Sequence, residues 1–208
     1  MPLSTIEEGI RELKKGNLII VTDNEDRENE GDFVMAAEKA TPSNVNFMIK
    51  KGGGLICVPM IGKRLDELKI PLMVENKNNS GKMGCKFTVS IDFKGKGSGI
   101  SAFDRCKTIK ELTNKSAKAE DFNRPGHIFP LRYQEGGVLK RDGHTEAGVD
   151  LCKLAGLYPA AVLCEILKED GNTAKREDIE KLAKEHNLKI ISIKDIINHI
   201  KQDYNKNQ

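Results

Sequence analysis

The sequence predicts one domain built on a β-sheet that helices cover on its faces. Strand-like apolar runs alternate with helical patterns through most of the 208 residues, which is typical of a sheet packed between helices. Several connections are short, and short connections favour antiparallel neighbours among the strands. No change in composition and no Ser/Pro-rich linker divides the chain, so we expect residues 1–208 to form a single domain.

Helix caps and turn residues predict the elements of the first third. Ser4 and Glu7 have the spacing of a capping box, and Gly16 ends the helix that follows. Thr41 and Pro42 are typical of a second helix start. Short apolar runs between these signals predict strands. The expected elements are helices from Ser4 to Gly16, from Thr41 to the glycines 52–54 and over 64–68, with strands over 18–22, 33–37 and 55–59.

A long polar segment separates these elements from the rest of the chain. Residues 74–86 contain glycine and have no period, so we expect a mobile loop of a length often found in lids. Alternation predicts a strand after it, and Ser101 and Gly156 are typical helix start and stop signals. The expected elements are strands or extended chain over 87–91, 126–133, 160–164 and 188–192, with helices from Ser101 and over 144–154, 176–186 and 194–200.

Composition excludes several classes of protein. Lys and Arg number 34 against 31 for Asp and Glu, with the signs interspersed, which gives no electrostatic case for binding nucleic acid or membrane. No apolar run approaches the roughly 20 residues that span a bilayer, and the N-terminus lacks signal-peptide features, so we expect a cytoplasmic protein. Five cysteines without a Cys-x-x-Cys pair disfavour a disulfide framework and a thiolate zinc site.

An acidic loop over residues 22–32 is the first candidate site. It contains six carboxylates and the guanidinium of Arg27 between two apolar runs. Like charges on a short loop repel one another unless a multivalent cation or a polyhydroxy ligand binds there. A solvated acidic loop is the alternative. Because the flanking runs 18–21 and 33–37 would hold both ends against a buried sheet, the loop is a site candidate.

The segment 141–146 is the second candidate site. If a helix begins near Gly143, its free N–H groups, the Thr145 hydroxyl and the Arg141 guanidinium converge, which suits a phosphate. His144 would lie beside that phosphate. The alternative is an ordinary helix cap with a surface arginine.

His127 and Glu165 are candidates for proton transfer. His127 lies between a Pro-Gly turn and an apolar strand, and a histidine exchanges protons near neutral pH. Glu165 ends a buried strand, where burial can raise the pKa of a base. A structural histidine and a strand that simply reaches solvent are the alternatives. Together with the acidic loop 22–32 and the segment 141–146, these groups would suit metal-assisted enolisation of a sugar phosphate.

Five segments in order resemble the 3,4-dihydroxy-2-butanone-4-phosphate synthase family of riboflavin biosynthesis, nearly from end to end. They are residues 26–32, 98–105, 124–127, 143–147 and 163–165. The resemblance implies an α+β fold, a three-layer α/β/α sandwich with a mixed β-sheet. It also implies conversion of D-ribulose 5-phosphate into 3,4-dihydroxy-2-butanone 4-phosphate and formate, by a magnesium-dependent homodimer with sites at or near the subunit interface. Many relatives add a cyclohydrolase domain, and we expect this chain to be monofunctional.

The resemblance also implies a role for each site residue. Glu28 would ligate two magnesium ions and His144 one of them, whereas His127 and Glu165 would be the essential proton-transfer pair. We expect manganese to substitute, because an imidazole ligand suits it better than magnesium. Glu30, Cys57 and Thr88 are further candidates for the pocket. The implied substrate-binding residues are Arg27, Glu28, Asp32, Arg141, Asp142, Gly143, His144, Thr145 and Glu165.

Two other functions are compatible with parts of the sequence. Another metal-dependent phosphosugar aldolase or isomerase could use the same ligands, and formate among the products would separate the two enzymes. A nucleotide- or RNA-binding module would need a basic stripe with exposed aromatic residues. Aromatic residues make up 5% of the chain, and the glycine-rich run 95–99 lacks the spacing of a nucleotide-binding loop.

Overall fold

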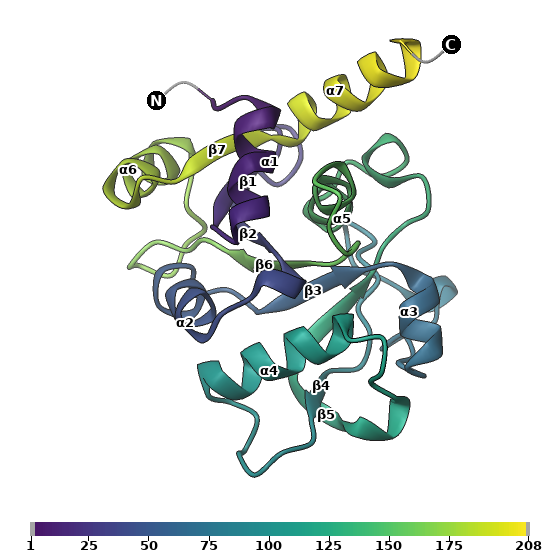
Figure 1. Cartoon of the computed structure of the whole chain (residues 1–208). Helices are drawn as coiled ribbons and strands as arrows, with labels where there is room; N and C mark the ends of the chain where they lie inside the picture. Colours follow the sequence, from purple (N-terminus) through teal and green to yellow (C-terminus); the bar gives the residue numbers. More distant parts are fainter. Residues whose placement is uncertain (1–2, 207–208) are drawn as a thin grey trace.

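The computed structural model describes residues 3–206, which form a mixed seven-stranded sheet between helices (Figure 1). The strand order is β4-β5-β3-β6-β2-β1-β7. The pairs β1–β7 and β3–β5 are parallel and the other neighbours are antiparallel. The strands are β1 (Ile19–Thr22), β2 (Gly31–Ala36), β3 (Cys57–Met60), β4 (Ile91–Phe93), β5 (Phe122–Arg132), β6 (Ala161–Glu165) and β7 (Lys189–Ser192).

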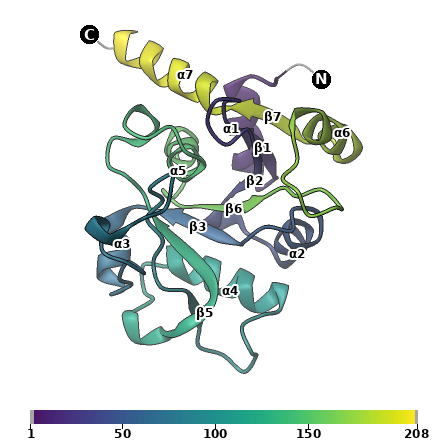
Figure 2. The ribbon, with the colours of Figure 1, turned by 180° about the vertical axis from the view of Figure 1, so that it is seen from behind.

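Helices cover both faces of this sheet, as the two opposite views show (Figures 1 and 2). On one face lie α1 (Ile6–Lys15), α5 (His144–Leu154) and α7 (Ile193–Lys206). On the other lie α2 (Pro42–Lys51), α4 (Ala102–Thr113) and α6 (Arg176–His186). The three-layer sandwich implied by the family resemblance is therefore confirmed. The short helices are α3 (Gly62–Glu67), η1 (Ala37–Lys39), η2 (Asn76–Asn78), η3 (Ala119–Asp121) and η4 (Gly137–Leu139).

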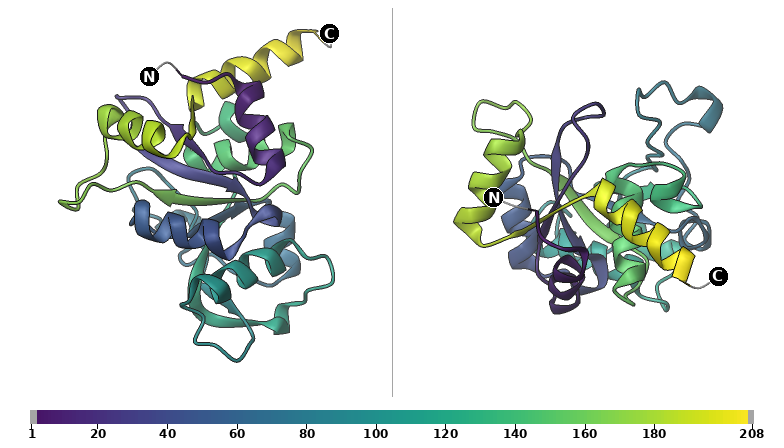
Figure 3. Two further views of the ribbon diagram at one scale, coloured as in Figure 1. Left: turned by 60° about the vertical axis from the view of Figure 1, so that its left-hand side comes forward. Right: turned by 90° about the horizontal axis from the view of Figure 1, so that it is seen from above.

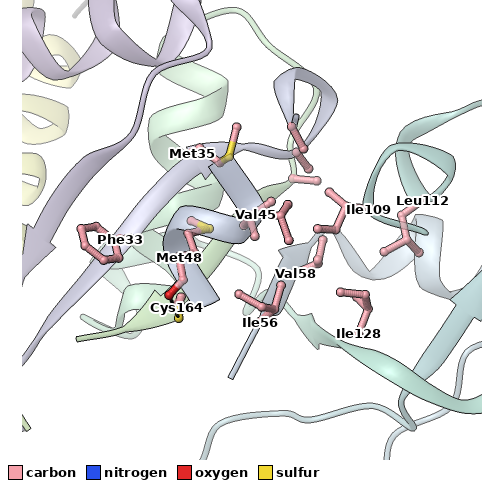
Figure 4. Close-up of a cluster of buried hydrophobic side chains, with 14 of the residues drawn as sticks. Phe33, Met35, Val45, Met48, Ile56, Val58, Ile109, Leu112, Ile128 and Cys164 are labelled. Carbon is pink, nitrogen blue, oxygen red and sulfur yellow. Dashed lines mark hydrogen bonds between the residues drawn. The ribbon is translucent and has the colours of Figure 1, made fainter. Parts of the chain in front are cut away.

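Strand periodicity divides the buried side chains into two cores. Phe33 faces the core under α2 and α4, and its neighbour Val34 faces the core under α1 and α5. Successive strand residues point to opposite faces, so both kinds of position are apolar in a strand covered on both sides. Figure 4 shows the first core, in which Met48 lies between Phe33 on one side and Ile109 on the other.

Most helix boundaries agree with the expectations, but α7 continues to Lys206 instead of ending near residue 200, and one cap is shifted by a residue. Thr41 and Ser101 cap α2 and α4 as predicted. The predicted Ser4–Glu7 capping box is wrong. The box joins Thr5 and Glu8 instead, because the backbone N–H of Ser4 donates to the Ile190 carbonyl and ties Ser4 to the edge of the sheet.

The predicted strand over 87–91 is wrong in extent. Phe87 and Thr88 form isolated bridges, and strand β4 begins only at Ile91. The Thr88 N–H donates to the Pro130 carbonyl at 3.1 Å, but proline has no N–H to return that bond, so a regular ladder cannot continue. Residues 74–86 form the predicted loop, which contains only the short turn η2.

The topology brings three separate segments to one side of the molecule. The loop of the β1–β2 hairpin and the loop that follows α3 both project there (Figure 3, right). The N-terminus of α5 lies close to both loops: His144 is near Glu28 of the first, and Thr145 is near Cys85 of the second. Across residues 3–206, no helix combines the length and apolar character needed to cross a membrane.

Candidate active site

One pocket gathers most of the residues that the sequence singled out. It encloses about 130 Å³ and lies on the face of the sheet that α5 covers. The acidic loop, strands β2, β3 and β6, the start of α5 and the 74–86 loop all contribute to it. Its lining residues are Arg27, Glu28, Glu30, Asp32, Cys57, Cys85, Phe87, Leu131, Arg141, His144, Thr145, Leu163 and Glu165.

Two carboxylates form the floor of the pocket. Asp32 and Glu165 lie opposite each other in the antiparallel pair β2–β6. Burial, and then the nearby charges of Glu165 and Glu28, raise the pKa of Asp32 well above its usual value. Glu165 accepts a hydrogen bond from the Leu55 N–H at 2.9 Å. The floor therefore pairs a carboxyl group that favours its neutral form with a second, oriented carboxylate.

The glycine triplet after α2 makes room for Glu165. A Cβ atom at Gly54 would lie 2.3 Å from Oε2 of Glu165 and 2.8 Å from its Cβ. No side chain fits at that distance, so residue 54 must be glycine if Glu165 is to keep its position. The sequence pointed only to the helix-ending role of residues 52–54.

Asp23 holds the acidic loop together through hydrogen bonds to both of its carboxylate oxygens. Its carboxylate accepts hydrogen bonds from the backbone N–H groups of Glu28 and Glu30, at 3.0 and 2.9 Å, and from the Arg27 guanidinium. Its side chain is only 1% exposed. Asn29 adopts a left-handed conformation (φ 54°) that asparagine tolerates well. Asp23 thus shapes the loop and leaves Glu28 facing the pocket.

Glu28 and His144 can hold a divalent cation. Ligand atoms of Asp23, Glu28 and His144 lie within 4.8 Å of one another. The buried Nε2 of His144 is 3.2 Å from the Val21 carbonyl oxygen, to which it can only donate, so Nδ1 carries the lone pair and lies 3.9 Å from Glu28. Burial also lowers the pKa of His144, which favours the neutral ring that a metal requires. Asp23 is the third group of this cluster, but both of its oxygens already accept hydrogen bonds within the loop, so Glu28 and His144 are the donors that most directly face a cation.

The start of α5 has the features of an anion site. Gly143 is the N-cap, and a Cβ there would lie 2.2 Å from Nη1 of Arg141 and 3.0 Å from Nη2 of Arg27. Two guanidinium groups therefore meet at a helix N-terminus, where free N–H groups also favour an anion. Thr145 lines the pocket beside them, whereas the side chain of Asp142 is 55% exposed and lies 3.7 Å from the Arg27 guanidinium.

Contacts that the sequence did not reveal hold Arg141 in place. Its guanidinium is ion-paired with Glu146, which is 1% exposed, and donates to the Met83 carbonyl at 3.0 and 3.2 Å. Cys85 lies near the Thr145 hydroxyl (3.6 Å). The 74–86 loop is thus connected to the anion site, and no motif in the sequence links these segments.

Cys57 lines the pocket as expected, whereas Thr88 does not. Burial raises the pKa of the Cys57 and Cys85 thiols, which favours their neutral form. The Thr88 hydroxyl is buried and donates to the Pro130 carbonyl at 2.9 Å, away from the lining.

His127 lies on the same face of the sheet but outside the pocket. Phe129 pairs with Cys57, and Cys57 pairs with Leu163. Counting back along these registers aligns His127 with Leu55 and Glu165, two strand spacings or roughly 10 Å from Glu165. Its side chain is 39% exposed, and its Nδ1 lies 2.6 Å from Asp92. Within one chain, the structure therefore brings Glu165 to the pocket but not His127.

Comparison with known proteins identifies the family. The model of the 3,4-dihydroxy-2-butanone 4-phosphate synthase family matches residues 7–199. The chain belongs to this family. The synthase of Wolinella succinogenes is 51% identical over 203 residues, which cover 98% of this chain and 58% of that protein. The RibBA protein of Endomicrobium trichonymphae is 54% identical over 94% of this chain and 48% of its own length. The chain thus spans about half the length of these curated relatives.

Solved structures of the synthase family share the fold. A crystal structure of a 3,4-dihydroxy-2-butanone 4-phosphate synthase in complex with two magnesium ions superposes with a TM-score of 0.91 at 37% identity. The match covers 96% of this chain and 98% of that one. The two-domain synthase RibBX of A. baumannii gives 0.90 at 46% identity, over 94% of this chain and 57% of that one. The family resemblance inferred from five segments is confirmed.

Proposed function

We propose that this protein converts D-ribulose 5-phosphate into 3,4-dihydroxy-2-butanone 4-phosphate and formate in riboflavin biosynthesis. The observation that carries the proposal is the convergence of three groups in one pocket. These are the donors Glu28 and His144, the carboxyl groups Asp32 and Glu165, and the anion site at the start of α5. Such a pocket matches a ligand with a phosphate at one end and vicinal oxygens at the other.

We assign the phosphate end to residues 141–145 and the sugar to Arg27 and Asp32. Arg141, Thr145 and the first N–H groups of α5 would bind the phosphate, with Asp142 and Gly143 shaping the turn. Arg27 lies between the acidic loop and Gly143, so it can contact the sugar next to the phosphate. Asp32 lies in the pocket opposite Glu165, so its carboxyl group can hydrogen-bond to a sugar oxygen.

The residues present fit the two magnesium ions that the relative binds, and we propose Mg²⁺ as cofactor with Mn²⁺ able to substitute. Glu28 would bridge both ions and His144 would ligate one. When bound, such ions stabilise the negative charge that develops on the sugar oxygens as the C1 proton leaves. Glu165 would take up and return protons. His127 of a second subunit would share this role. The water lost at C3 is recovered when C4 leaves as formate, so the overall reaction needs no other reactant.

Release of formate tests this function. Purified protein with D-ribulose 5-phosphate and magnesium should produce formate, and EDTA should abolish the reaction because Glu28 and His144 act through the ion. Excess magnesium or manganese should restore it. Consumption of the substrate without formate would instead identify another phosphosugar enzyme, such as an aldolase or isomerase.

We further propose a homodimer in which a second copy packs near His127. His127 lies outside the pocket of its own chain, and the adjoining start of α4 exposes Ile100 and Phe103, at 49% and 74%. Exposed apolar groups beside an incomplete proton-transfer pair fit an interface that completes the site. Each His127 would then act at or near the boundary between two subunits.

Replacing Phe103 by glutamate tests the dimer. We expect the dissociation constant to rise by roughly 30-fold or more, since an interface aromatic contributes about 2 kcal/mol. Light scattering after size-exclusion chromatography measures the mass, and formate release should fall in parallel. Tyr204→Glu, which alters another aromatic residue that is 64% exposed, is the matched control. A Phe103→Glu protein that remains dimeric at nanomolar concentration would contradict the proposed interface.

We propose that residues 1–208 act as one synthase domain and that the protein is cytoplasmic. All five cysteines are free thiols, which is typical of a reducing compartment.

A further inference from the structure

A buried carboxylate is directed at His127. Asp92, in the edge strand β4, is 7% exposed. Its Oδ2 lies 2.6 Å from Nδ1 of the His127 ring, and its Oδ1 accepts the backbone N–H of His127 at 2.9 Å. Both oxygens therefore bind the same residue, one through its ring and the other through its main chain. This double contact fixes the ring relative to the strand.

The backbone around this pair is built for close approach. The β4–β5 register shifts between Ile91 and Asp92, which opens the segment before His127. A Cβ at Gly126 would lie 2.0 Å from the Ile91 carbonyl carbon. A Cβ at Gly99, which has φ +91°, would lie 2.0 Å from Oδ2 of Asp92 and 2.8 Å from Nδ1 of His127. Two glycines thus permit a contact that any other residue would obstruct.

We propose that Asp92 is a positioning residue that keeps the His127 proton on Nδ1, so that Nε2 exchanges protons during the reaction. An ionised carboxylate can only accept, so the 2.6 Å contact requires hydrogen on Nδ1. A proton taken up at Nε2 creates an imidazolium, which the Asp92 charge stabilises until the proton is returned. The inference deepens the proposed function and rests on it, because Asp92 acts only through His127.

The tautomer of His127 provides a test that does not depend on activity. Long-range ¹H–¹⁵N correlation spectra distinguish protonated from unprotonated ring nitrogens, and the chain has only four histidines. The His127 signals are assigned with a His127→Gln variant. In the unmodified protein with a neutral His127 ring, we expect the Nδ1–H tautomer. In Asp92→Asn, the amide can donate to Nδ1, so the Nε2–H tautomer should predominate. An Nε2–H tautomer in the unmodified protein would overturn the proposal, even if the variant failed to fold.

Kinetics then separate a positioning role from a merely structural one. Asp92→Asn should lower kcat between about 10²- and 10⁴-fold, the range for a positioned acid–base group, with KM within about threefold because Asp92 does not line the pocket. Glu7→Gln removes a carboxylate 3.5 Å from a different histidine, His199, and should leave kcat and the His127 signals unchanged. A changed tautomer with unchanged kcat would refute the role of Asp92. An unmodified protein that releases no formate, but has the expected tautomer, would instead refute the proposed function.

Discussion

Replacing Glu28 by glutamine should lower kcat for formate release on the order of 10³-fold or more. A bound cation contributes several kcal/mol of charge stabilisation, and each 1.4 kcal/mol corresponds to a factor of ten in rate. Glutamine keeps the size of the side chain and removes the charge. Asp23 already accepts backbone N–H groups on both of its oxygens, so we expect it to replace the lost ligand only weakly. The variant should therefore lose both activity and magnesium affinity.

Two measurements test this expectation. Formate release at increasing magnesium gives kcat and the metal requirement, and titration with Mn²⁺ followed by electron paramagnetic resonance reports binding without turnover. Glu25→Gln is the matched control, because Glu25 is an exposed carboxylate of the same loop outside the pocket lining. Metal-dependent formate release that survives in Glu28→Gln would show that the bridging role belongs to another residue.

Replacing Glu165 by glutamine should lower kcat by about 10²- to 10⁴-fold while magnesium binding persists, because the group lost is a proton-transfer residue and not a proposed ligand. The amide oxygen can still accept the Leu55 N–H, so the floor of the pocket should keep its geometry. Asp32 should respond as well. The Glu165 charge is, after burial, the largest cause of the raised pKa of Asp32. Its removal should move that pKa downward, so that Asp32 ionises at lower pH.

The test for Glu165 compares the loss of kcat with any loss of metal affinity. Formate release gives kcat, Mn²⁺ titration gives metal affinity, and thermal unfolding shows whether the fold is intact. Glu169→Gln changes an exposed carboxylate shortly after β6 and should behave as the unmodified protein. If Glu165→Gln retained kcat, its assignment to proton transfer would be wrong. Equal loss of metal binding and activity would instead indicate that Glu165 belongs to the ligand set.

Local patterns were sufficient for most of the fold. Helix α6 and helix α5 begin and end at the predicted residues, since their caps and apolar spacing are encoded within a few positions. The predicted boundaries were wrong where a residue far away in the sequence changed the local hydrogen bonding. Ser4 is tied to the sheet through Ile190, and the strand after residue 86 is interrupted because Pro130, on another strand, has no N–H to donate.

The sequence by itself determined which chemical groups are available, because five ordered segments carry the acidic loop, the anion site and the two proton-transfer candidates. Only the tertiary structure decided which of those groups shape the loop, which face the pocket and which lie next to one another. Six carboxylates of the loop look equivalent in sequence, yet backbone hydrogen bonds engage Asp23 and leave Glu28 facing His144. Pairing of β2 with β6 joins Asp32 to Glu165 across more than a hundred residues, and the strand order leaves His127 two strands away beside Asp92. Such relations depend on long-range strand register, which no local run of residues encodes.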